Sequence, residues 1–346
     1  MSETAVNASA LRVVVVRDRV EWDGHVRDLG GHPLQLWGWG EVKAHGAWRP
    51  LRVRVIGADD ATVGAAQILV RRLPFPFRSL SYVPRGPMLA EGADGSAVAE
   101  AIAAWARRAI AGIAISFEPQ WPVGTPVRIK GSRISENDIL LPRTLLIDLT
   151  QTEDELLARL SRTTRQGVRR SSRTDLVYRE VTTDEDMQRC LDVYEETSRR
   201  AGFQLHDRSY YEQVYRDLGP NSALYAAFDG DDPVAFLWLA VSAATAFELY
   251  GGSNDHGRKL RANYSLKWLA ITDSKRRGAR TYDVNGLLND GISDFKRSFS
   301  DHDDDVFVGT IDVPFSPVLY SLWTRLLPRA KSILRSIRSR RSGKPE

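Results

Sequence analysis

Cysteine is almost absent from this chain of 346 residues. Its single cysteine, Cys190, excludes an internal disulfide and any zinc site that needs several cysteines. Cys190 falls beside Leu191 and Val193 on the apolar side of a predicted helix. We therefore expect a buried thiol that takes no part in chemistry.

Long apolar runs are absent as well. No run approaches the roughly 18 to 20 residues that span a bilayer, and the mean hydropathy is negative. The first ten residues, MSETAVNASA, lack the basic and apolar regions of a secretory signal. With 42% hydrophobic and 27% charged residues, the composition is that of an ordinary globular protein. These features predict a soluble, cytoplasmic protein.

Several common catalytic motifs are also missing. The sequence contains no P-loop, no HExxH, no nucleophile elbow and no cluster of histidines and cysteines. Metal catalysis and nucleotide hydrolysis are therefore not expected, and we predict neither a metal site nor a cofactor. The net charge of +4 permits an anionic partner but does not identify it.

The length predicts two domains, because it exceeds the usual size of one. Short β-branched or alternating runs are interspersed with helical stretches, which indicates an α/β or α+β fold. In the first part, strands are expected over residues 13–16, 53–56, 66–70 and 79–83, and an alanine-rich helix over residues 96–111.

The second part begins with a helix, because Thr152 and Glu155 form a capping-box signature before an apolar stripe. Another helix, three strands, a helix over residues 264–277 and strand-like residues around Asp283 and at 306–312 follow. This order is that of the acetyltransferase-like superfamily, an analogy of fold that gives no function by itself.

The segment that would bind coenzyme A departs from the usual pattern. An acetyl-CoA enzyme carries a glycine-containing turn whose backbone N–H groups approach the pyrophosphate. Residues 258–264 of this chain read RKLRANY and contain no glycine. The departure indicates a different acyl donor.

Five motifs occur in order along the chain: WGWGEVK at residues 37–43, YVPRGP at 82–87, YGGS at 250–253, YSLKW at 264–268 and DFKRSF at 294–299. Together they resemble the successive motifs of the FemABX peptidyltransferases. Enzymes of that family transfer an amino acid from aminoacyl-tRNA to the stem peptide of a cell-wall precursor. The resemblance runs from residue 35 to residue 312.

The resemblance implies a fold of two acetyltransferase-like domains, with the C-terminal segment returning to the first. The expected bounds are residues 1–148 with 313–346 for the first domain and residues 149–312 for the second. The short link between Thr152 and Leu176 leaves no room for the long helical arm of some members. We expect a monomer.

The resemblance also implies the binding residues for lipid II or UDP-MurNAc-pentapeptide. Lys43 and Arg208 would hold the diphosphate, since an ammonium and a guanidinium neutralise phosphate oxygens. Tyr211 and Tyr250 would line the muramyl-peptide channel, and Glu118 stands where an acidic substrate contact is expected. Other members carry a tyrosine two positions before Tyr250, where this chain has a glutamate.

Catalysis would depend on Lys296 and Phe295 within the DFKRSF motif. Attack of an amine on the ester of aminoacyl-tRNA places negative charge on the carbonyl oxygen, and a fixed ammonium stabilises it. Phe295 and Phe299 would shield the ammonium and position the acceptor. The alternative is a pair of core aromatics around a lysine that reaches solvent.

Arginines crowd one predicted helix of the second part. A stripe at helical spacing would bind the phosphates of aminoacyl-tRNA and comprises Arg162, Arg165, Arg169 and Arg173. A solvated charged face is the alternative, and a competing basic patch comprises Lys275, Arg276 and Arg277.

The stretch 317–341 is basic and amphipathic, so it either lies on the anionic inner face of the plasma membrane or packs on the first domain.

The sequence therefore predicts an aminoacyltransferase of peptidoglycan biosynthesis. An enzyme of the same fold that uses a small acyl donor such as acyl-CoA is the main alternative, and a binding protein without activity is a third. The amino acid transferred, the acceptor amine and the choice between a lipid-linked and a nucleotide-linked acceptor stay open.

Overall fold

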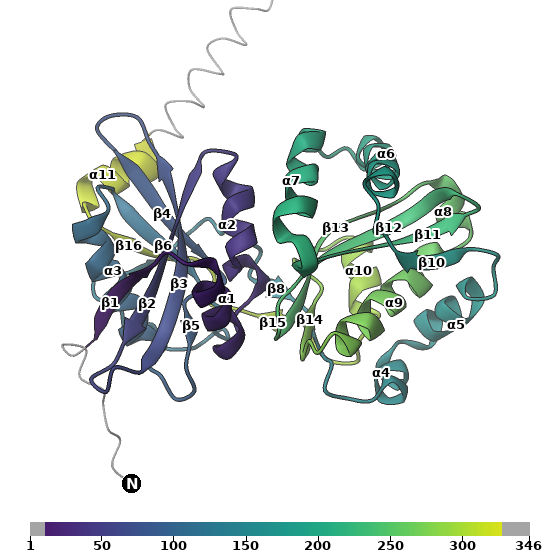
Figure 1. Ribbon diagram of the computed structural model, residues 1–346, viewed down its shortest axis with the longest axis horizontal. Coiled ribbons are helices and arrows are strands. Elements are labelled where there is room, and N and C mark those ends of the chain that lie inside the picture. The colour runs from purple at the N-terminus through teal and green to yellow at the C-terminus, as the bar shows by residue number, and fades with distance from the viewer. Residues whose placement is uncertain (1–10, 327–346) are drawn as a thin grey trace, which may run out of the picture.

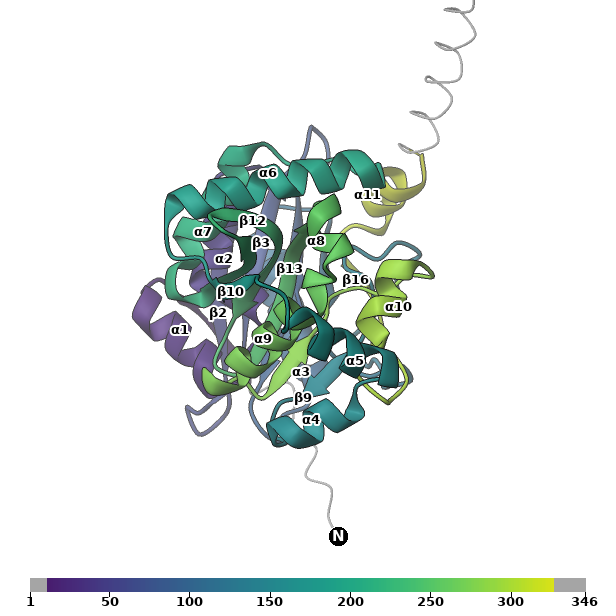
Figure 2. The same ribbon diagram turned by 90° about the vertical axis from the view of Figure 1, so that its right-hand side faces the viewer.

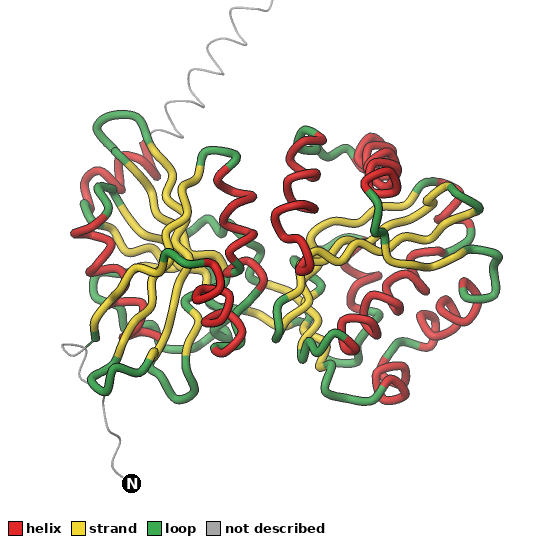
Figure 3. Tube along the Cα trace, in the orientation of Figure 1, coloured by secondary structure: helices red, strands yellow, loops and turns green. Residues whose placement is uncertain are grey.

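The computed structural model describes residues 11–326. Two β-sheets lie side by side, and helices cover both faces of each (Figures 1 and 3). Turning the molecule by a quarter shows the second sheet in front, between α6 on one side and α9, α4 and α5 on the other (Figure 2).

The first sheet has eight strands in the order β1-β2-β3-β4-β6-β16-β7, with β5 paired to β3. All its pairs are antiparallel except β4 with β6. Its strands are β1 (Arg12–Val16), β2 (Trp48–Ile56), β3 (Thr62–Arg72), β4 (Ser79–Pro84), β5 (Met88–Leu89), β6 (Ala114–Glu118), β7 (Arg133–Ile134) and β16 (Ile311–Pro314).

Helix α3 (Gly95–Ala109) covers one face of this sheet, while α1 (Arg19–Asp28) and α2 (Trp37–Ala44) lie on the other. Asp94 caps α3 through the N–H groups of its first turn, and Val98, Ile102 and Ala106 recur at helical spacing against the sheet. The predicted helix over 96–111 is thus confirmed, although it ends two residues earlier.

The second sheet has six strands in the order β10-β11-β12-β13-β14-β9. Only β13 and β14 pair in parallel. Its strands are β9 (Leu146–Asp148), β10 (Val177–Glu180), β11 (Ser222–Asp229), β12 (Asp232–Val241), β13 (Thr245–Ser253) and β14 (Thr281–Asp283).

Alternate residues of β11 face different helices. Leu224, Ala226 and Phe228 pack against α6 (Asp184–Ala201) and α7 (Arg208–Leu218). Ala223, Tyr225 and Ala227 pack on the opposite face, and the helices there are α4 (Glu153–Arg159), α5 (Arg162–Ser171) and α9 (Ala262–Arg276). Both faces are therefore buried, which explains why the central strands are apolar throughout.

Cys190 is buried on α6, as predicted, and burial raises the pKa of its thiol to about 12.

The two domains share a core where α2 meets α7. Leu34, Trp39 and Val42 of the first domain pack in the same apolar cluster as Tyr211 and Val214 of the second. A Cβ added to Gly38 would lie 2.3 Å from the carbonyl oxygen of Asp217. Only glycine permits this approach of the two backbones, so the contact fixes the domains against each other.

The chain returns to the first domain at its C-terminal side. β16 lies between β6 and β7, whereas β15 (Asp305–Val306) pairs with β8 (Arg143–Thr144). The expectation of one strand over 306–312 is therefore wrong, because the chain crosses between domains there, through Gly309 at a φ of 77°.

The domain bounds set after residue 148 stay a prediction, and β9, just before that point, pairs with β14 of the second sheet.

The described part of the C-terminal segment packs on the first domain. α11 (Pro317–Ser321) and a following helical turn (Leu322–Leu326) lie against Phe77 and Ile113. The remainder of the predicted amphipathic stretch lies outside the described residues. Within residues 11–326, no helix is both long and apolar enough to cross a bilayer.

Candidate functional site

The second sheet opens where its two parallel strands separate. β13 and β14 pair only from Thr245 to Phe247, opposite Thr281 to Asp283. Beyond this point the side-chain amide of Asn285 donates a hydrogen bond of 2.8 Å to the carbonyl oxygen of Glu248. This side-chain hydrogen bond replaces the next backbone hydrogen bond between the two strands. Beyond it β13 and β14 diverge and leave a wedge-shaped gap.

A β-bulge shapes the same part of β13. The register against β12 skips Leu249, so Glu248 and Tyr250 lie opposite adjacent residues of β12. In a regular strand the two side chains would share a face, but the extra residue sends them to opposite faces. Glu248 accordingly contacts α9, and Tyr250 contacts rings of α6 and α7.

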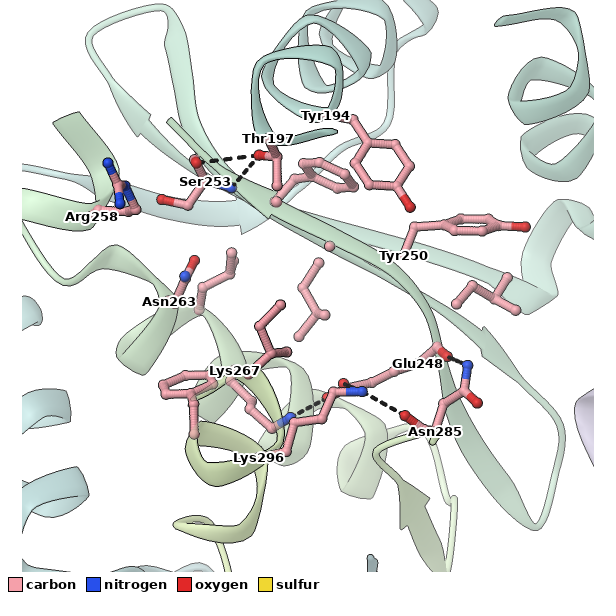
Figure 4. A pocket seen from close by; sticks show the side chains of 18 of the residues that line it. Tyr194, Thr197, Glu248, Tyr250, Ser253, Arg258, Asn263, Lys267, Asn285 and Lys296 are labelled. Atoms are coloured by element: carbon pink, nitrogen blue, oxygen red, sulfur yellow. Dashed lines mark hydrogen bonds and ion pairs between the residues drawn. The ribbon is translucent and has the colours of Figure 1, made fainter. Parts of the chain in front are cut away.

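A cavity of about 410 Å³ fills the wedge (Figure 4). It passes between the strand ends and connects a polar end near α9 with an aromatic end near α6. Its polar and aromatic lining includes Tyr194, Glu248, Tyr250, Asn263, Lys267, Asn285, Phe295 and Lys296.

Lys296 lies at the polar end, on α10 (Gly291–Arg297). Its ammonium donates hydrogen bonds to the carbonyl oxygens of Val284 (2.6 Å) and Asn285 (2.5 Å), in the loop that follows β14. Since an ammonium has three N–H donors, one remains for a ligand in the cavity. The Lys296 side chain is 18% exposed, so it is held in place yet reachable.

Glu248 and Lys267 form a buried ion pair beside Lys296. The Lys267 ammonium donates to Glu248 Oε1 at 2.5 Å, and the Tyr282 hydroxyl donates to the same oxygen at 2.7 Å. Glu248 Oε2 lies 3.8 Å from Lys296 Nζ. Burial lowers the pKa of Lys267, Glu248 opposes that shift and Lys296 adds to it. Two lysines against one carboxylate make this end of the cavity suited to developing negative charge.

Three aromatic rings pack together beside Lys267. The Phe295 ring lies 5.1 Å from Tyr264 and 5.2 Å from Phe299, both edge to face. Phe295 lines the cavity, whereas Phe299 is buried in the core. The apolar walls keep water from the charged groups and strengthen their electrostatic effect.

Tyrosines occupy the other end of the cavity. The Tyr250 hydroxyl donates to the Tyr210 hydroxyl at 3.2 Å, and Lys43 Nζ donates to the same Tyr210 oxygen at 2.9 Å. The Tyr211 ring lies 5.1 Å from that of Tyr250, and Lys43 Nζ lies 4.3 Å above the Trp39 ring. Burial raises the pKa of Tyr250, so its hydroxyl stays protonated.

Comparisons with known proteins show what this chain is similar to. A family model described as "Acetyltransferase (GNAT) domain" matches residues 158–297. The crystal structure of FemX superposes with a TM-score of 0.80 at 20% identity, covering 90% of this chain and 99% of that one. The lipid II:glycine glycyltransferase of Staphylococcus aureus strain USA300 is 22% identical, over 86% of this chain and 92% of its own. The chain is therefore similar to FemABX-type proteins over most of its length. The predicted family and the predicted fold of two acetyltransferase-like domains are thereby confirmed.

A more distant structural neighbour is L-PGS from Bacillus licheniformis, with a TM-score of 0.56 at 15% identity over 90% of this chain and 97% of that one. Between β9 and β10 this chain has only the short helices α4 and α5. Within the described residues, no long helical arm extends from the second domain.

Only some of the predicted site residues lie together in the structure. Lys296, Phe295 and Tyr250 line one cavity, and Lys43 and Tyr211 join it through Tyr210. Their roles stay predictions.

Arg208, at the start of α7, donates to Glu195 at 2.7 Å and to Asp192. These side-chain hydrogen bonds, first to Glu195 and then to Asp192, raise the pKa of Arg208. The two carboxylates occupy only part of the five N–H donors of the guanidinium, and a diphosphate there would compete with their negative charge.

Glu118 lies apart from this cavity. Its carboxylate accepts hydrogen bonds from the Thr310 hydroxyl (2.5 Å), the Tyr82 hydroxyl and the N–H groups of Ile139 (2.7 Å) and Leu140 (3.0 Å). Glu118 is 2% exposed, so every neighbour of its oxygens is already a protein donor. The substrate contact expected from the FemABX resemblance stays a prediction.

The arginine stripe follows α5, on the outer side of the second domain. Arg162, Arg169 and Arg173 are exposed. Arg165 instead donates to the carbonyl oxygens of Ala158 (2.7 Å) and Leu160, where α4 ends. In the competing patch, Arg276 and Arg277 pair with Glu153 and Glu180, and Lys275 donates to Leu149.

The segment that replaces the coenzyme A turn is helical. α8 (Asp255–Lys259) begins directly after β13, and its Gly257 packs against the carbonyl oxygen of Val234, where an added Cβ would lie 2.3 Å away. This glycine serves packing, and the cavity-lining Gly251 and Gly252 lie within strand β13. Across residues 11–326, no group of three or more metal-ligating side chains gathers.

Sequence reasoning missed Tyr210, Lys267 and Asn285. Tyr210 stands next to the predicted Tyr211, and Lys267 lies within the YSLKW motif. The motif was a usable signal, since a lysine in an otherwise apolar helical stretch needs a buried partner.

Proposed function

We propose that the protein transfers an amino acid from aminoacyl-tRNA to the stem-peptide amine of a peptidoglycan precursor, lipid II or UDP-MurNAc-pentapeptide. The observation that carries this proposal is the Lys296 ammonium. Two backbone carbonyls hold it at the polar end of the cavity, 3.8 Å from Glu248 Oε2. Its third N–H donor makes no hydrogen bond to a described residue and can donate to an oxyanion. The similarity to a lipid II:glycine glycyltransferase over most of both chains supports the same reaction class.

The reaction joins the acceptor nitrogen to the ester carbonyl carbon of the donor. The tetrahedral intermediate carries its negative charge on the former carbonyl oxygen, within reach of Lys296 Nζ. The bond to the ribose oxygen then breaks, the ribose hydroxyl takes up a proton, and the new amide has lost one from its nitrogen. Because an ester is already activated, neither a covalent enzyme intermediate nor a metal is needed.

The acceptor would enter from the aromatic end. Tyr250, Tyr211 and Tyr210 supply ring faces for the muramyl peptide, and Lys43 supplies a positive charge for the diphosphate. The donor would approach from the α10 side, with its phosphates near the exposed arginines of α5. Binding of aminoacyl-tRNA should then weaken as salt rises.

An acyl-CoA-dependent transfer is the second candidate. The match of residues 158–297 to an acetyltransferase model favours it. The helical segment α8 and the absence of a glycine turn before α9 weigh against it.

The deciding experiment measures transfer of radiolabelled amino acids from a charged-tRNA pool to lipid-linked and nucleotide-linked muramyl pentapeptides. Lys296→Met should lower the rate by about 10²- to 10³-fold, the usual effect of losing one oxyanion donor. Lys130→Met, which removes an exposed lysine of the first domain, serves as the matched control. No transfer by folded wild type, together with transfer from acyl-CoA, would establish the second candidate instead.

Peripheral membrane contact belongs to the same proposal. A chain truncated after Pro328 should bind anionic vesicles less well than the full chain, because it lacks most of the basic C-terminal stretch. Unchanged co-sedimentation would remove this stretch from the account.

A further inference from the structure

The loop between β3 and β4 presents an aromatic side chain to solvent. Phe75 is 93% exposed, more than any other large apolar side chain of the described residues. It lies between Pro74 and Pro76 in the segment LPFPFR, residues 73–78. A single exposed apolar residue is common, so its setting decides whether it has a role.

The loop is closed by its own hydrogen bonds. Leu73 N–H donates to the Arg78 carbonyl oxygen at 2.8 Å, and Phe77 N–H donates to the Pro74 carbonyl oxygen at 2.9 Å. Phe77 is buried, with its ring 5.1 Å from that of Trp323. One phenylalanine therefore anchors the loop, while Phe75, two residues earlier, is held outward.

The surroundings of Phe75 are positively charged. Arg71, Arg72 and Arg78 are exposed, and none of them forms an ion pair with a carboxylate of the described residues. Residues 71–90 and 101–117, which include the neighbouring end of α3, contain no aspartate or glutamate. Elsewhere many surface arginines pair with carboxylates, as Arg277 does with Glu180.

The position of the loop matches that of the substrate-binding residues. The loop packs on the α11 segment through Leu73 and Phe77, and Val318 of α11 is 77% exposed. The β3–β4 loop, α11, the end of α2 and the start of α7 lie at the same end of the molecule (Figures 1 and 2). The two helix ends carry Lys43 and Arg208.

We propose that Phe75, Arg71, Arg72 and Arg78, the Phe75 loop, dock the protein on an anionic phospholipid bilayer. Phe75 enters the boundary between headgroups and acyl chains, and the arginines contact the lipid phosphates. Docking by this end turns the diphosphate-binding residues toward the lipid surface. The inference rests on the proposed function only for the lipid-linked acceptor, because binding to a bilayer does not itself need transfer.

The test is co-sedimentation of the full chain with vesicles of two parts phosphatidylcholine to one part phosphatidylglycerol. Phe75→Ser should lower the partition constant about tenfold, the effect of keeping one phenylalanine out of an apolar phase. Arg72→Ala should lower it about fivefold, and vesicles of phosphatidylcholine alone should bind poorly. Val20→Ser and Arg280→Ala, which change comparably exposed residues elsewhere, should bind like wild type.

Transfer assays separate this inference from the proposed function. Phe75→Ser should slow transfer to the vesicle-borne acceptor and leave transfer to the nucleotide-linked acceptor unchanged. Equal vesicle binding by wild type and Phe75→Ser would overturn the inference. So would a fall in oligomeric state of the free protein on Phe75→Ser, since a second copy would then cover the loop. If vesicle binding depends on Phe75 but the wild type transfers an amino acid to neither acceptor, the docking inference stands and the proposed transfer reaction is refuted.

Discussion

The two domains share one strand topology and differ in how far their parallel strands pair. In each, four antiparallel strands lead to a parallel pair joined through a helix, and an antiparallel strand follows. The first sheet additionally has β7 beyond β16 and β5 beside β3. In the first domain β4 and β6 pair over five positions, ending at Pro84 opposite Glu118. In the second domain β13 and β14 pair over three and then separate.

A glutamate stands where the parallel pairing ends in both domains, but its surroundings differ. Glu118 is enclosed by backbone and hydroxyl donors, and the strands stay together. Glu248 is bound by Lys267 and Tyr282 on one oxygen only, and its other oxygen faces Lys296 and the cavity. The first domain, whose parallel strands stay paired, is called the closed domain, and the second, whose strands separate around the cavity, the open domain. The difference depends on where the pairing stops and on which donors bind the glutamate carboxylate.

The largest effect on stability should come from breaking the ion pair of the open domain. Lys267→Met leaves the buried Glu248 without its hydrogen-bonded cation, with only Lys296 at 3.8 Å. Loss of one partner of a buried pair costs about 3 to 5 kcal/mol of unfolding free energy. Chemical denaturation would measure it. The double variant Lys267→Met with Glu248→Gln should recover much of the loss, whereas equal stability of the two variants would contradict the pairing.

The corresponding substitution in the closed domain is at Glu118. Glu118→Gln replaces a carboxylate surrounded by donors with an amide that brings donors of its own, at a cost of about 2 kcal/mol. Transfer per folded molecule should be unchanged if the role is structural. A raised KM for the acceptor would instead establish the substrate contact that the family resemblance predicts.

The seam between the domains should respond to pH. His32 is buried against Asp283, at the end of β14, and burial lowers the pKa of His32 to about 4 despite that carboxylate. The unfolded chain binds a proton near pH 6.5 and the folded chain does not, so stability falls as pH drops through that window. About 2 kcal/mol should be lost between pH 7 and pH 5.

His32→Asn is the matched variant for this titration, since asparagine can still accept from the Leu34 N–H. Denaturation midpoints compared at both pH values should show a flatter dependence in the variant. A parallel decline in both proteins would rule out His32 as the titrating group.

The smallest expected effect lies at the aromatic end of the open domain. Tyr250→Phe removes the hydroxyl that donates to Tyr210 and should raise the KM for the acceptor about fivefold, near 1 kcal/mol, with little change in kcat. Tyr215→Phe, which loses a hydrogen bond to the Val181 carbonyl away from the cavity, is the control.

Local signals predicted much of the fold. The capping box at Thr152 and Glu155 is present, and the expected β3, β4 and α3 form, because their determinants lie within a few residues. The motif DFKRSF located Lys296. The bulge at Leu249 could not be predicted from the sequence, because it depends on the pairing of β13 with β12. It also reverses the alternation of side chains between the two faces of the strand, from which the orientation of each side chain is predicted.

The partners of Lys296 and Glu248 lie on α9 and on β14 with the loop that follows it, so no spacing in the sequence reveals them. The error at residues 306–312 has the same origin, because only the tertiary arrangement decides that the chain leaves the two-stranded sheet of β8 and β15 there and joins the first sheet as β16.

The hydrogen bond from the Asn285 side chain to the Glu248 carbonyl oxygen, which replaces a backbone pairing, has a consequence for how related sequences diverge. Where a ladder of backbone groups sets the gap between strands, the gap is the same for every sequence that folds. Here a residue type sets it, so a single substitution at position 285 can widen or narrow the cavity while both strands keep their register. The width available to the transferred group is thereby open to selection independently of the stability of the sheet.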